Sequence, residues 1–584
     1  MPTVTTLTAD APRDPPRDPP RAAPPRADTN VKDTIESILV AFILAFVFRC
    51  FVIEAFVIPT GSMAPTLLGA HMALRCPDCG YRFTAGYGIS DQTSFTVDDV
   101  ASYHDRQGRK EPKTYGLFCP NCGFRLPPNL PDDAANDATA PAVRYGDRIL
   151  VMKYLYLLHE PQRWDVVVFK SPATDTGDYS INYIKRLVAT PGESAFVAHG
   201  DLYVAPPGAH QDSAGNPRAL VPGDFKVQPK PRHAQDALWR IVFDADYVPI
   251  RLPRSVNKPS NGRPVIDDPW THPWQPTGSG WITNRPDAGV GERAFRFDGP
   301  AGALVFNRAA NRNTSSLTDW LAYDQSEGQM GSADTLDQPP YGNGRQVSDL
   351  KLAFTSDGIA GDGVLRAILS KTEAANASNR TDVVAELAAG KVRVLLRTAH
   401  GESVIGEKDI DLRGRRAISI ENVDYRITLR IDGRDVIVSN ERQYAPSVQR
   451  VVDDANPPVG GARLEGENCK TTLTHLQLWR DVYYRDSGGD LVRGIADDFP
   501  TRVAALGPDE FFVLGDNSAM SQDGRYWDNA IDVPGEQLTA RAGMVPRRFM
   551  LGKAFFVYWP AGFRPADNVP LGIVPNFGEM RFIR

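Results

Sequence analysis

Hydrophobic and polar residues alternate over several stretches of this chain, which is the pattern of half-buried β-strands. One such stretch leads to an Asp432-Gly433 hairpin turn, and its alternating apolar positions are Val423, Tyr425, Ile427, Leu429 and Ile431, followed by Val436 and Val438. Leu350, Leu352 and Phe354 alternate in the same way, as do Leu476 and Leu478. No helical segments separate these short strands. The pattern predicts a mainly β protein with a β-sandwich over residues 205–490.

A different pattern lies near the N-terminus, where Thr34–Ile58 is the longest apolar stretch. Its uncharged centre, Ser37–Phe48, is 12 residues long, which is also the length of the apolar part of a signal peptide. No small-x-small cleavage site follows Phe48, however. If Arg49 extends to the lipid headgroups, the helix reaches the roughly 20 residues that a bilayer requires. The sequence therefore predicts one transmembrane helix over residues 34–57, with the lipid bilayer as a partner.

The distribution of basic residues predicts an orientation for this helix. Residues 1–33 are rich in proline and arginine and poor in bulky apolar residues, so we expect a disordered tail. Basic residues precede the helix, whereas only Arg75 is basic among the 20 residues after Ile58. The positive-inside rule then places the N-terminus in the cytoplasm and the rest of the chain on the outer, periplasmic face of the inner membrane.

Length and charge narrow the class of protein. A chain of 584 residues is too long for one ordinary core, so two to four domains are expected. The net charge is -6 and the basic residues form no block. This balance argues against nucleic acid as a partner.

Ser62 is the candidate nucleophile, in a loop that contains Pro59, Gly61 and Pro65. A serine in such a loop is also a common turn residue. The sequence has no GxSxG or HExxH motif and only nine scattered histidines, so a histidine base has little support. The candidate base is Lys185, in an apolar, β-type context. A buried lysine without a carboxylate partner has a lowered pKa, and its neutral amine accepts a proton from a serine hydroxyl.

Four motif blocks resemble bacterial type I signal peptidase, a membrane-anchored serine protease that uses a serine-lysine dyad to remove signal peptides from exported proteins. The blocks occur in the order typical of that family: 58–67, 145–151 with 164–170, 183–193, and 515–525 followed by 552–560. They divide the expected catalytic core into residues 58–73, 141–204 and 491–584. The resemblance implies a β catalytic core that needs no cofactor, and substrates that are preproteins cut after small-x-small motifs, delivered by secretion machinery.

The resemblance also implies roles for individual residues. Ser62 corresponds to the nucleophile, Lys185 to the general base, and Ser521 to the residue that orients the lysine amine. Thr60 corresponds to an oxyanion-hole donor that is usually serine. The positions that match structural ion pairs are Arg186, Asp516, Asp523 and Arg525, and those that match the substrate pockets are Ile58, Met63, Leu67, Tyr183 and Ile184. Two residues depart from the family pattern, because Trp164 stands at a position usually held by glycine and Gly524 at one often held by serine.

Residues 74–128 interrupt the motifs and carry two Cys-Pro-x-Cys-Gly turns, with the cysteines at Cys76, Cys79, Cys119 and Cys122. Two such turns direct four thiolates at one tetrahedral centre, which predicts a zinc-ribbon-like insertion with a structural zinc ion. An oxidising compartment would favour disulfides instead. Cys50 and Cys469 have no evident partner and are expected to be buried thiols.

The 205–490 insertion has the outline of a jelly roll, and no motif indicates its ligand. We expect Trp270, Trp274 and Trp281 to pack in its core or turns, although exposed tryptophans also stack on sugars. Two alternatives to a general signal peptidase stay open at this point. One is a serine-lysine peptidase dedicated to a single partner, and the other is a non-catalytic envelope binding protein built on a peptidase fold.

Overall fold

The computed structural model describes residues 31–86, 102–104, 110–112, 117–126, 143–172, 181–211, 218–249, 270–283, 293–307, 310, 317–326, 344–373, 378–454, 456–486, 503–527, 531–533, 538–560 and 576–584. Contacts divide the chain into two units, Met1–Val52 and Ile53–Arg584. Of the predicted disordered tail over residues 1–33, residues 1–30 lie outside the described residues, whereas residues 31–33 belong to helix α1, so the prediction is wrong for these three.

In the first unit, helix α1 covers Val31–Phe51. Among the helices that the structure describes, none combines the length and the hydropathy needed to cross a membrane. The predicted transmembrane helix over 34–57, and the inner-membrane localisation derived from it, are therefore wrong. The physical reason lies in the charges at both ends of α1, because Lys32, Asp33, Glu36 and Arg49 leave only Ser37–Phe48 uncharged.

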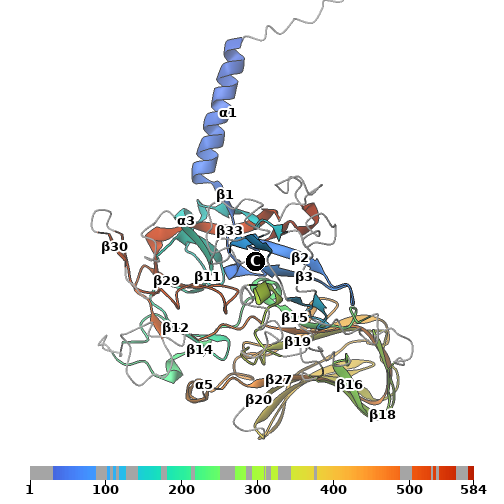
Figure 1. Cartoon of the computed structure of the whole chain (residues 1–584). Helices are drawn as coiled ribbons and strands as arrows, with labels where there is room; N and C mark the ends of the chain where they lie inside the picture. The colour runs from blue at the N-terminus through green and yellow to red at the C-terminus, as the bar shows by residue number, and fades with distance from the viewer. Residues whose placement is uncertain are drawn as a thin grey trace, which may run out of the picture. The chain divides into compact units, whose positions relative to one another are not determined.

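The second unit is built almost entirely of β-strands, as the alternation predicts (Figure 1). Its first large sheet has eight strands in the order β1-β9-β33-β10-β11-β29-β32, with β34 paired to β33. The strands are β1 (Ile53–Val57), β9 (Arg148–Met152), β10 (Val166–Lys170), β11 (Asn182–Ala189), β29 (Glu510–Leu514), β32 (Val545–Pro546), β33 (Met550–Trp559) and β34 (Arg581–Phe582). The sheet therefore joins strands from the expected core pieces 141–204 and 491–584 to β1, which lies directly before the first expected piece, 58–73.

A smaller sheet has the order β14-β13-β12-β28. Its strands are β12 (Ser194–Ala198), β13 (Asp201–Ala205), β14 (Lys226–Val227) and β28 (Ala504–Ala505). One hydrophobic cluster joins Val197 and Leu202 of this sheet to Val188 of β11 and Leu238 of helix α4 (Arg232–Leu238). Residues 205–238 thus pack directly on the sheet that carries the motifs.

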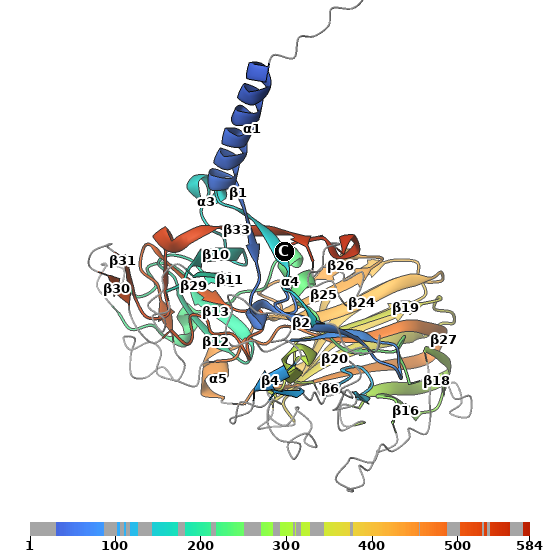
Figure 2. The same cartoon turned by 45° about the horizontal axis from the view of Figure 1, so that its top comes forward.

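The 205–490 region forms a 13-stranded sheet with the main order β23-β22-β21-β20-β27-β19-β24-β25-β26 (Figure 2). The main strands are β19 (Leu350–Ser356), β20 (Val364–Thr372), β21 (Arg380–Ala388), β22 (Lys391–Thr398), β23 (Gly401–Asp409), β24 (Arg416–Val423), β25 (Arg426–Ile431), β26 (Arg434–Val438) and β27 (Val459–Arg480). Strands β15 (Arg240–Asp244), β16 (Trp274–Gly278), β17 (Trp281–Thr283) and β18 (Ala294–Phe306) complete it. These strands enclose one large core, so a β-sandwich fits this region.

The predicted strand pattern needs one correction in this sheet. The alternation placed Val423 and Tyr425 on one strand, but Asp424 and Tyr425 both have positive φ, 47° and 54°, and form the turn between β24 and β25. Neither residue is a glycine or asparagine, so the usual turn signal is missing. The predicted Asp432-Gly433 turn is present between β25 and β26. Trp274 and Trp281 are buried and Trp270 is partly buried against the same core, as expected.

The remaining elements are short. Two small sheets flank the cysteine turns, with β2 (His71–Arg75) between β3 (Arg82–Gly86) and β8 (Val143–Arg144), and β6 (Leu117–Phe118) paired to β7 (Arg125–Leu126). The other elements are β4 (Ser102–His104), β5 (Lys110–Pro112), β30 (Ile531–Val533), β31 (Leu538–Ala540), helices α3 (Leu155–Leu158) and α5 (Val448–Asp453), and the 3-10 turns η1 (Gly61–Met63), η3 (Pro222–Asp224), η5 (Ala322–Ser326), η8 (Arg547–Phe549) and η9 (Phe577–Glu579).

Candidate active site

Ser62 lies at the centre of a short 3-10 turn that directly follows strand β1. Strand β1 ends at Val57, residues 58–60 lead into η1, and the Ser62 residue is 8% exposed. Strand β1 pairs only with β9, so its other edge is not paired within the described sheet. A nucleophile at the end of an edge strand is accessible to a chain that adds to that edge.

Lys185 lies on β11, where the register pairs it with Val167 of β10. Its side chain faces Ser62. The Lys185 Nζ donates a hydrogen bond of 2.6 Å to Ser62 Oγ, although 123 positions separate the two residues. Lys185 is 4% exposed, and it has no carboxylate within ion-pair distance among the described residues. The pKa of Lys185 is lowered to about 8. Burial is the main cause; the charge of Asp523 acts to raise this pKa and that of Arg525 to lower it. The amine is therefore partly neutral near physiological pH.

Two further hydroxyl groups border this pair. Thr60 Oγ1 donates to Ser62 Oγ at 3.4 Å, so the expected oxyanion-hole donor is beside the nucleophile. The Ser521 hydroxyl is buried and makes no hydrogen bond within the described part of the chain. The predicted bond from Ser521 to the Lys185 amine is thus not formed in this conformation. Ser521 instead packs against Gly515, where an added Cβ would lie 2.2 Å from its Oγ.

The predicted ion-pair residues form two separate pairs. Arg186, next to Lys185 on β11, donates from Nε and an Nη to the two carboxylate oxygens of Asp516, both at 2.7 Å. Arg525 donates to both oxygens of Asp523, at 2.8 and 2.7 Å. The same carboxylate accepts the Gly515 N–H at 2.8 Å. The first pair fastens the last motif to the lysine strand, and the second fixes the shape of the motif itself.

Four of the five predicted pocket residues come together, and one lies elsewhere. Ile58, Met63, Leu67 and Ile184 are buried in one hydrophobic cluster with Val151 and Val168. Tyr183 instead packs with Phe169 and Trp527 in a different cluster, since consecutive residues of β11 point to opposite faces. Its ring centroid lies 5.6 Å from the Lys185 Nζ, so Tyr183 borders the lysine and not the other four residues.

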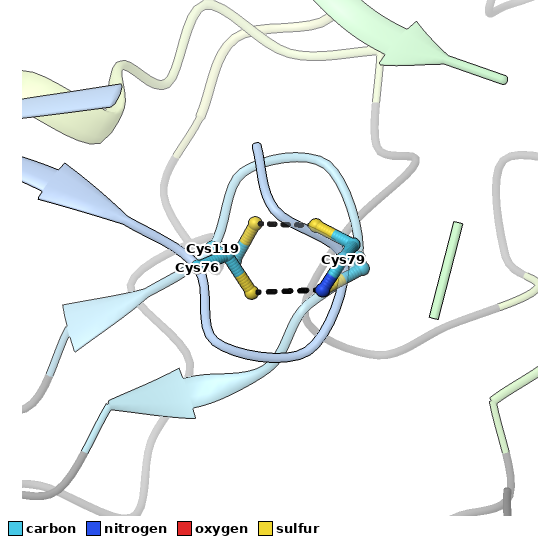
Figure 3. A group of neighbouring side chains, drawn as sticks. Cys76, Cys79 and Cys119 are labelled. Atoms are coloured by element: carbon cyan, nitrogen blue, oxygen red, sulfur yellow. Dashed lines mark hydrogen bonds between the residues drawn. The ribbon is translucent and has the colours of Figure 1, made fainter. Parts of the chain in front are cut away.

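The four cysteines of the two Cys-Pro-x-Cys-Gly turns meet at one point. Figure 3 shows three of them, Cys76, Cys79 and Cys119. Their sulfur atoms all lie within 4.8 Å of one another, with Cys76 to Cys122 and Cys79 to Cys119 both at 3.6 Å. Sulfurs around a tetrahedral zinc with ~2.3 Å bonds are about 3.8 Å apart. None of the four forms a disulfide in the structure, and the sulfur separations exceed the length of a disulfide bond. The donor set and its spacing fit a structural zinc ion. Cys469 is a buried free thiol, as predicted, and the Cys50 side chain lies outside the described residues.

Asp201, Asp349 and Asp424 form a second buried cluster of possible metal ligands. Lys230 donates to Asp424 at 2.6 Å, and Lys371 donates to Asp349. These ammonium groups already neutralise part of the acidic charge. We therefore conclude that this cluster connects β13 to the sandwich and does not serve as a metal site.

Comparison with known proteins matches two segments of the chain to one family. Residues 134–219 and 428–559 match the family described as signal peptidase, peptidase S26. The two matched segments together cover less than half of the chain. Lys185, Asp516 and Ser521 lie within them, whereas Ser62 lies outside.

Individual signal peptidases show the same partial match. A probable signal peptidase I-2 of a Synechocystis strain is 30% identical over 88 residues, which cover 15% of this chain and 40% of the relative. Signal peptidase I of Pseudomonas fluorescens is 37% identical over 76 residues, or 13% of this chain and 22% of the relative. The chain thus spans less than half the length of either relative. Among solved structures, a carbohydrate-binding module from Bacillus subtilis matches at 12% identity, covering 35% of this chain and 94% of the module, with a TM-score of 0.20. A score this low supports no conclusion about fold or ligand.

The two departures from the signal peptidase pattern have local explanations. Trp164 has φ 76°, a left-handed conformation that glycine adopts without strain. Its ring is buried in the cluster that includes Ala234 and Leu238 of the insertion, so packing offsets the backbone cost. At Gly524, an added Cβ would lie 2.8 Å from the carbonyl oxygen of Gly543, so serine does not fit here without a shift.

The sequence did not indicate three residues that contact the Ser62 loop directly or through one neighbour. Asn517 belongs to the last motif but had no assigned role, and its backbone N–H donates to the Ser62 carbonyl at 3.0 Å. Tyr323 and Asp324 belong to η5, deep within the 205–490 insertion. Their neighbourhood is created by the folding of distant segments, so no spacing in the sequence signals it.

Proposed function

We propose that this chain is a serine endopeptidase of the signal peptidase I type, which cleaves N-terminal signal peptides from preproteins after small-x-small motifs. The observation that carries the proposal is the 2.6 Å contact between Ser62 Oγ and the amine of a buried lysine. A lysine that only stabilises the fold is normally paired with a carboxylate, as Lys230 is with Asp424. Lys185 instead faces a hydroxyl.

In the proposed mechanism, the extended cleavage segment of a preprotein adds as a strand beside the Ser62 loop. Neutral Lys185 accepts the Ser62 hydroxyl proton as Oγ attacks the scissile carbonyl carbon. The Thr60 hydroxyl and the Ser62 N–H stabilise the negative oxygen that develops. The protonated lysine then donates to the leaving amine, which releases the mature protein and leaves the signal peptide as an ester on Ser62. Water, deprotonated by Lys185, hydrolyses this ester.

The preference for small residues follows from the surroundings of the pair. Ile58, Met63, Leu67 and Ile184 are already closely packed, so we expect the pockets that they border to be shallow. A large side chain would clash there, while alanine would fit. The four cysteines are proposed to bind a zinc ion that stabilises the fold and takes no part in the reaction, because four protein ligands leave no position for water.

The proposal is tested with the purified full chain and several unrelated preproteins, by following product formation and identifying the cut site by mass. We expect cleavage of more than one preprotein, and loss of cleavage in Ser62→Ala and Lys185→Ala while both variants still unfold in a single cooperative transition. Substantial turnover by Lys185→Ala would show that Lys185 is not the general base and would contradict the proposed serine-lysine dyad. Cleavage of a single preprotein only would favour a dedicated peptidase.

A further inference from the structure

The 3-10 turn η5, with its neighbours Trp320 and Leu321, lies against the loop that carries Ser62. The Tyr323 ring is 4% exposed and fits against two glycines, Gly61 and Gly86. An added Cβ would lie 2.3 Å from Tyr323 Cε1 at Gly61 and 2.5 Å from it at Gly86. The Tyr323 hydroxyl donates to the Ala70 carbonyl at 3.3 Å. A residue of the insertion therefore touches the position directly before the nucleophile.

Asp324 reaches the same loop through Asn517. The Asn517 side-chain amide donates to Asp324 Oδ1 at 2.6 Å and to the Gly61 carbonyl at 3.2 Å. Both partners are acceptors only, so the amide nitrogen must face them. The Asn517 backbone N–H meanwhile donates to the Ser62 carbonyl. Asp324 thus orients Asn517, which binds the carbonyl groups of both Gly61 and Ser62.

Charged contacts fix this segment at its N-terminal end. Arg480 donates to the carbonyl groups of Asp319 and Trp320, both at 2.9 Å. Arg485 donates to the Asp319 carboxylate at 2.5 Å, and its own backbone carbonyl accepts from Arg525 of the last motif at 2.8 Å. The segment is therefore attached both to the sandwich and to the motif that flanks Lys185.

The segment also contacts the cysteine cluster. Ala322 packs against the hydrophobic group formed by Cys76, Cys79, Phe83, Cys119 and Cys122. One residue farther along, Tyr323 contacts the Ser62 loop. A single short turn consequently lies between the proposed zinc site and the candidate nucleophile.

We propose that Tyr323 and Asp324 of the large insertion are positioning residues for Ser62, which hold the 58–68 loop so that Ser62 Oγ stays within bonding distance of Lys185. This inference rests on the proposed peptidase function. Misplacing a nucleophile by about 1 Å can reduce a rate roughly 100-fold, and surrounding packing and hydrogen bonds supply the required precision. The insertion accordingly forms part of the site and is more than an appended domain.

The test compares two pairs of variants of the full chain. Tyr323→Ala removes the ring, whereas Tyr323→Phe keeps it and loses only the hydroxyl. Asp324→Ala removes the carboxylate that accepts the Asn517 hydrogen bond. Asp324→Asn keeps a side-chain oxygen at the same position, which can still accept that bond. Measurements are kcat and KM on a preprotein, hydrogen exchange of residues 58–68, and the unfolding transition.

We expect kcat to fall roughly 10- to 100-fold in both alanine variants with KM changed less than about threefold, and to recover in the Phe and Asn variants to within about threefold of wild type. Exchange over 58–68 should increase in the alanine variants only. Wild-type kcat in both alanine variants, or a fall in kcat without increased exchange in Asp324→Ala, would overturn the inference. If Tyr323→Ala does not fold, the comparison of Asp324→Ala with Asp324→Asn tests the inference by itself.

The exchange measurement also separates the two proposals. If the wild-type chain cleaves no preprotein, the peptidase function fails. Increased exchange over 58–68 in the alanine variants would then still support the positioning role, and unchanged exchange would remove it.

Discussion

Arg186 and Asp516 are joined by two hydrogen bonds of 2.7 Å, although 330 positions lie between them in the chain. Neither side chain is exposed to solvent. Burial alone acts to raise the pKa of Asp516, but the Arg186 guanidinium beside it holds that pKa below its ordinary value. Because Lys185 is the next residue on β11, this pair fixes the distance between the lysine strand and the last motif.

We predict that Arg186→Met lowers the free energy of unfolding by ~3–5 kcal/mol, because it leaves the Asp516 carboxylate buried without its counter-charge. Urea unfolding monitored by tryptophan fluorescence measures the change. The double variant Arg186→Met with Asp516→Leu is the control. It should recover part of the loss, because it removes the unpaired carboxylate, although the buried Arg240 then loses the charge of Asp516. A loss below ~1 kcal/mol in the single variant would contradict a buried, fully paired interaction.

The pH dependence of cleavage should follow Lys185. Burial lowers the pKa of this amine to about 8. Below that pH the amine is charged and cannot accept the Ser62 proton, so kcat/KM should fall about tenfold per pH unit, and above it the rate should level off. The measurement is kcat/KM from pH 6 to 10 on one preprotein. A rate that does not change between pH 6 and 9 would show that another group is the base.

The same lowered pKa predicts a stability effect. The folded state disfavours the charged amine, so Lys185→Met should raise the free energy of unfolding at pH 7, by ~1–3 kcal/mol. The folded pKa is about 8 and the ordinary value is 10.5, so the gain should be complete below pH 8 and should shrink as the pH rises toward 10.5. Denaturant unfolding at pH 7 and pH 10 tests this. Ser62→Ala, which removes only the hydroxyl partner, is the control, and an equal gain at both pH values would be inconsistent with the prediction.

The sequence predicted those parts of the site whose chemistry is local. Ser62, Lys185 and the Arg186 and Asp516 pair occur in motifs with recognisable order, and the four cysteines occur in two identical turns. Alternation likewise identified β19 and the turn at Asp432, because one face of each strand is buried. In these cases the residue types themselves carry the physical constraint.

Other features depend on contacts between distant segments, which no pattern along the chain indicated. Tyr323 meets Gly61 only because the insertion folds back onto the core. The turn at Asp424 and Tyr425 lacks glycine because surrounding strands hold it in place. The interpretation of α1 failed for another reason: its apolar centre was judged long enough only by assuming that Arg49 reaches out of the bilayer.

Trp164 allows backbone strain and side-chain packing to be measured separately. Its φ of 76° is strained for any residue except glycine, but its ring fills the core between β11 and the insertion. We predict that Trp164→Gly loses ~1–3 kcal/mol of stability, because the lost packing exceeds the relief of strain. Trp164→Ala removes the same ring and keeps the strain, so it should be about 1 kcal/mol less stable than Trp164→Gly. Equal stability of the two variants in urea unfolding would show that the backbone there is not strained.

The four-cysteine cluster can be tested for bound zinc or for disulfides. The cluster holds β2 and β3 together directly after the Ser62 loop, and Ala322 of η5 packs against it. We predict that the purified chain contains one zinc ion and that Cys119→Ser loses it, with a lower unfolding temperature and faster hydrogen exchange over residues 58–68. Cys469→Ser is the matched control, because Cys469 is also buried and free but lies on β27, outside the cluster; this variant should retain the metal. Elemental analysis measures the zinc content. If the chain contains no metal and the four cluster cysteines react with an alkylating reagent only after reduction, they form disulfides instead.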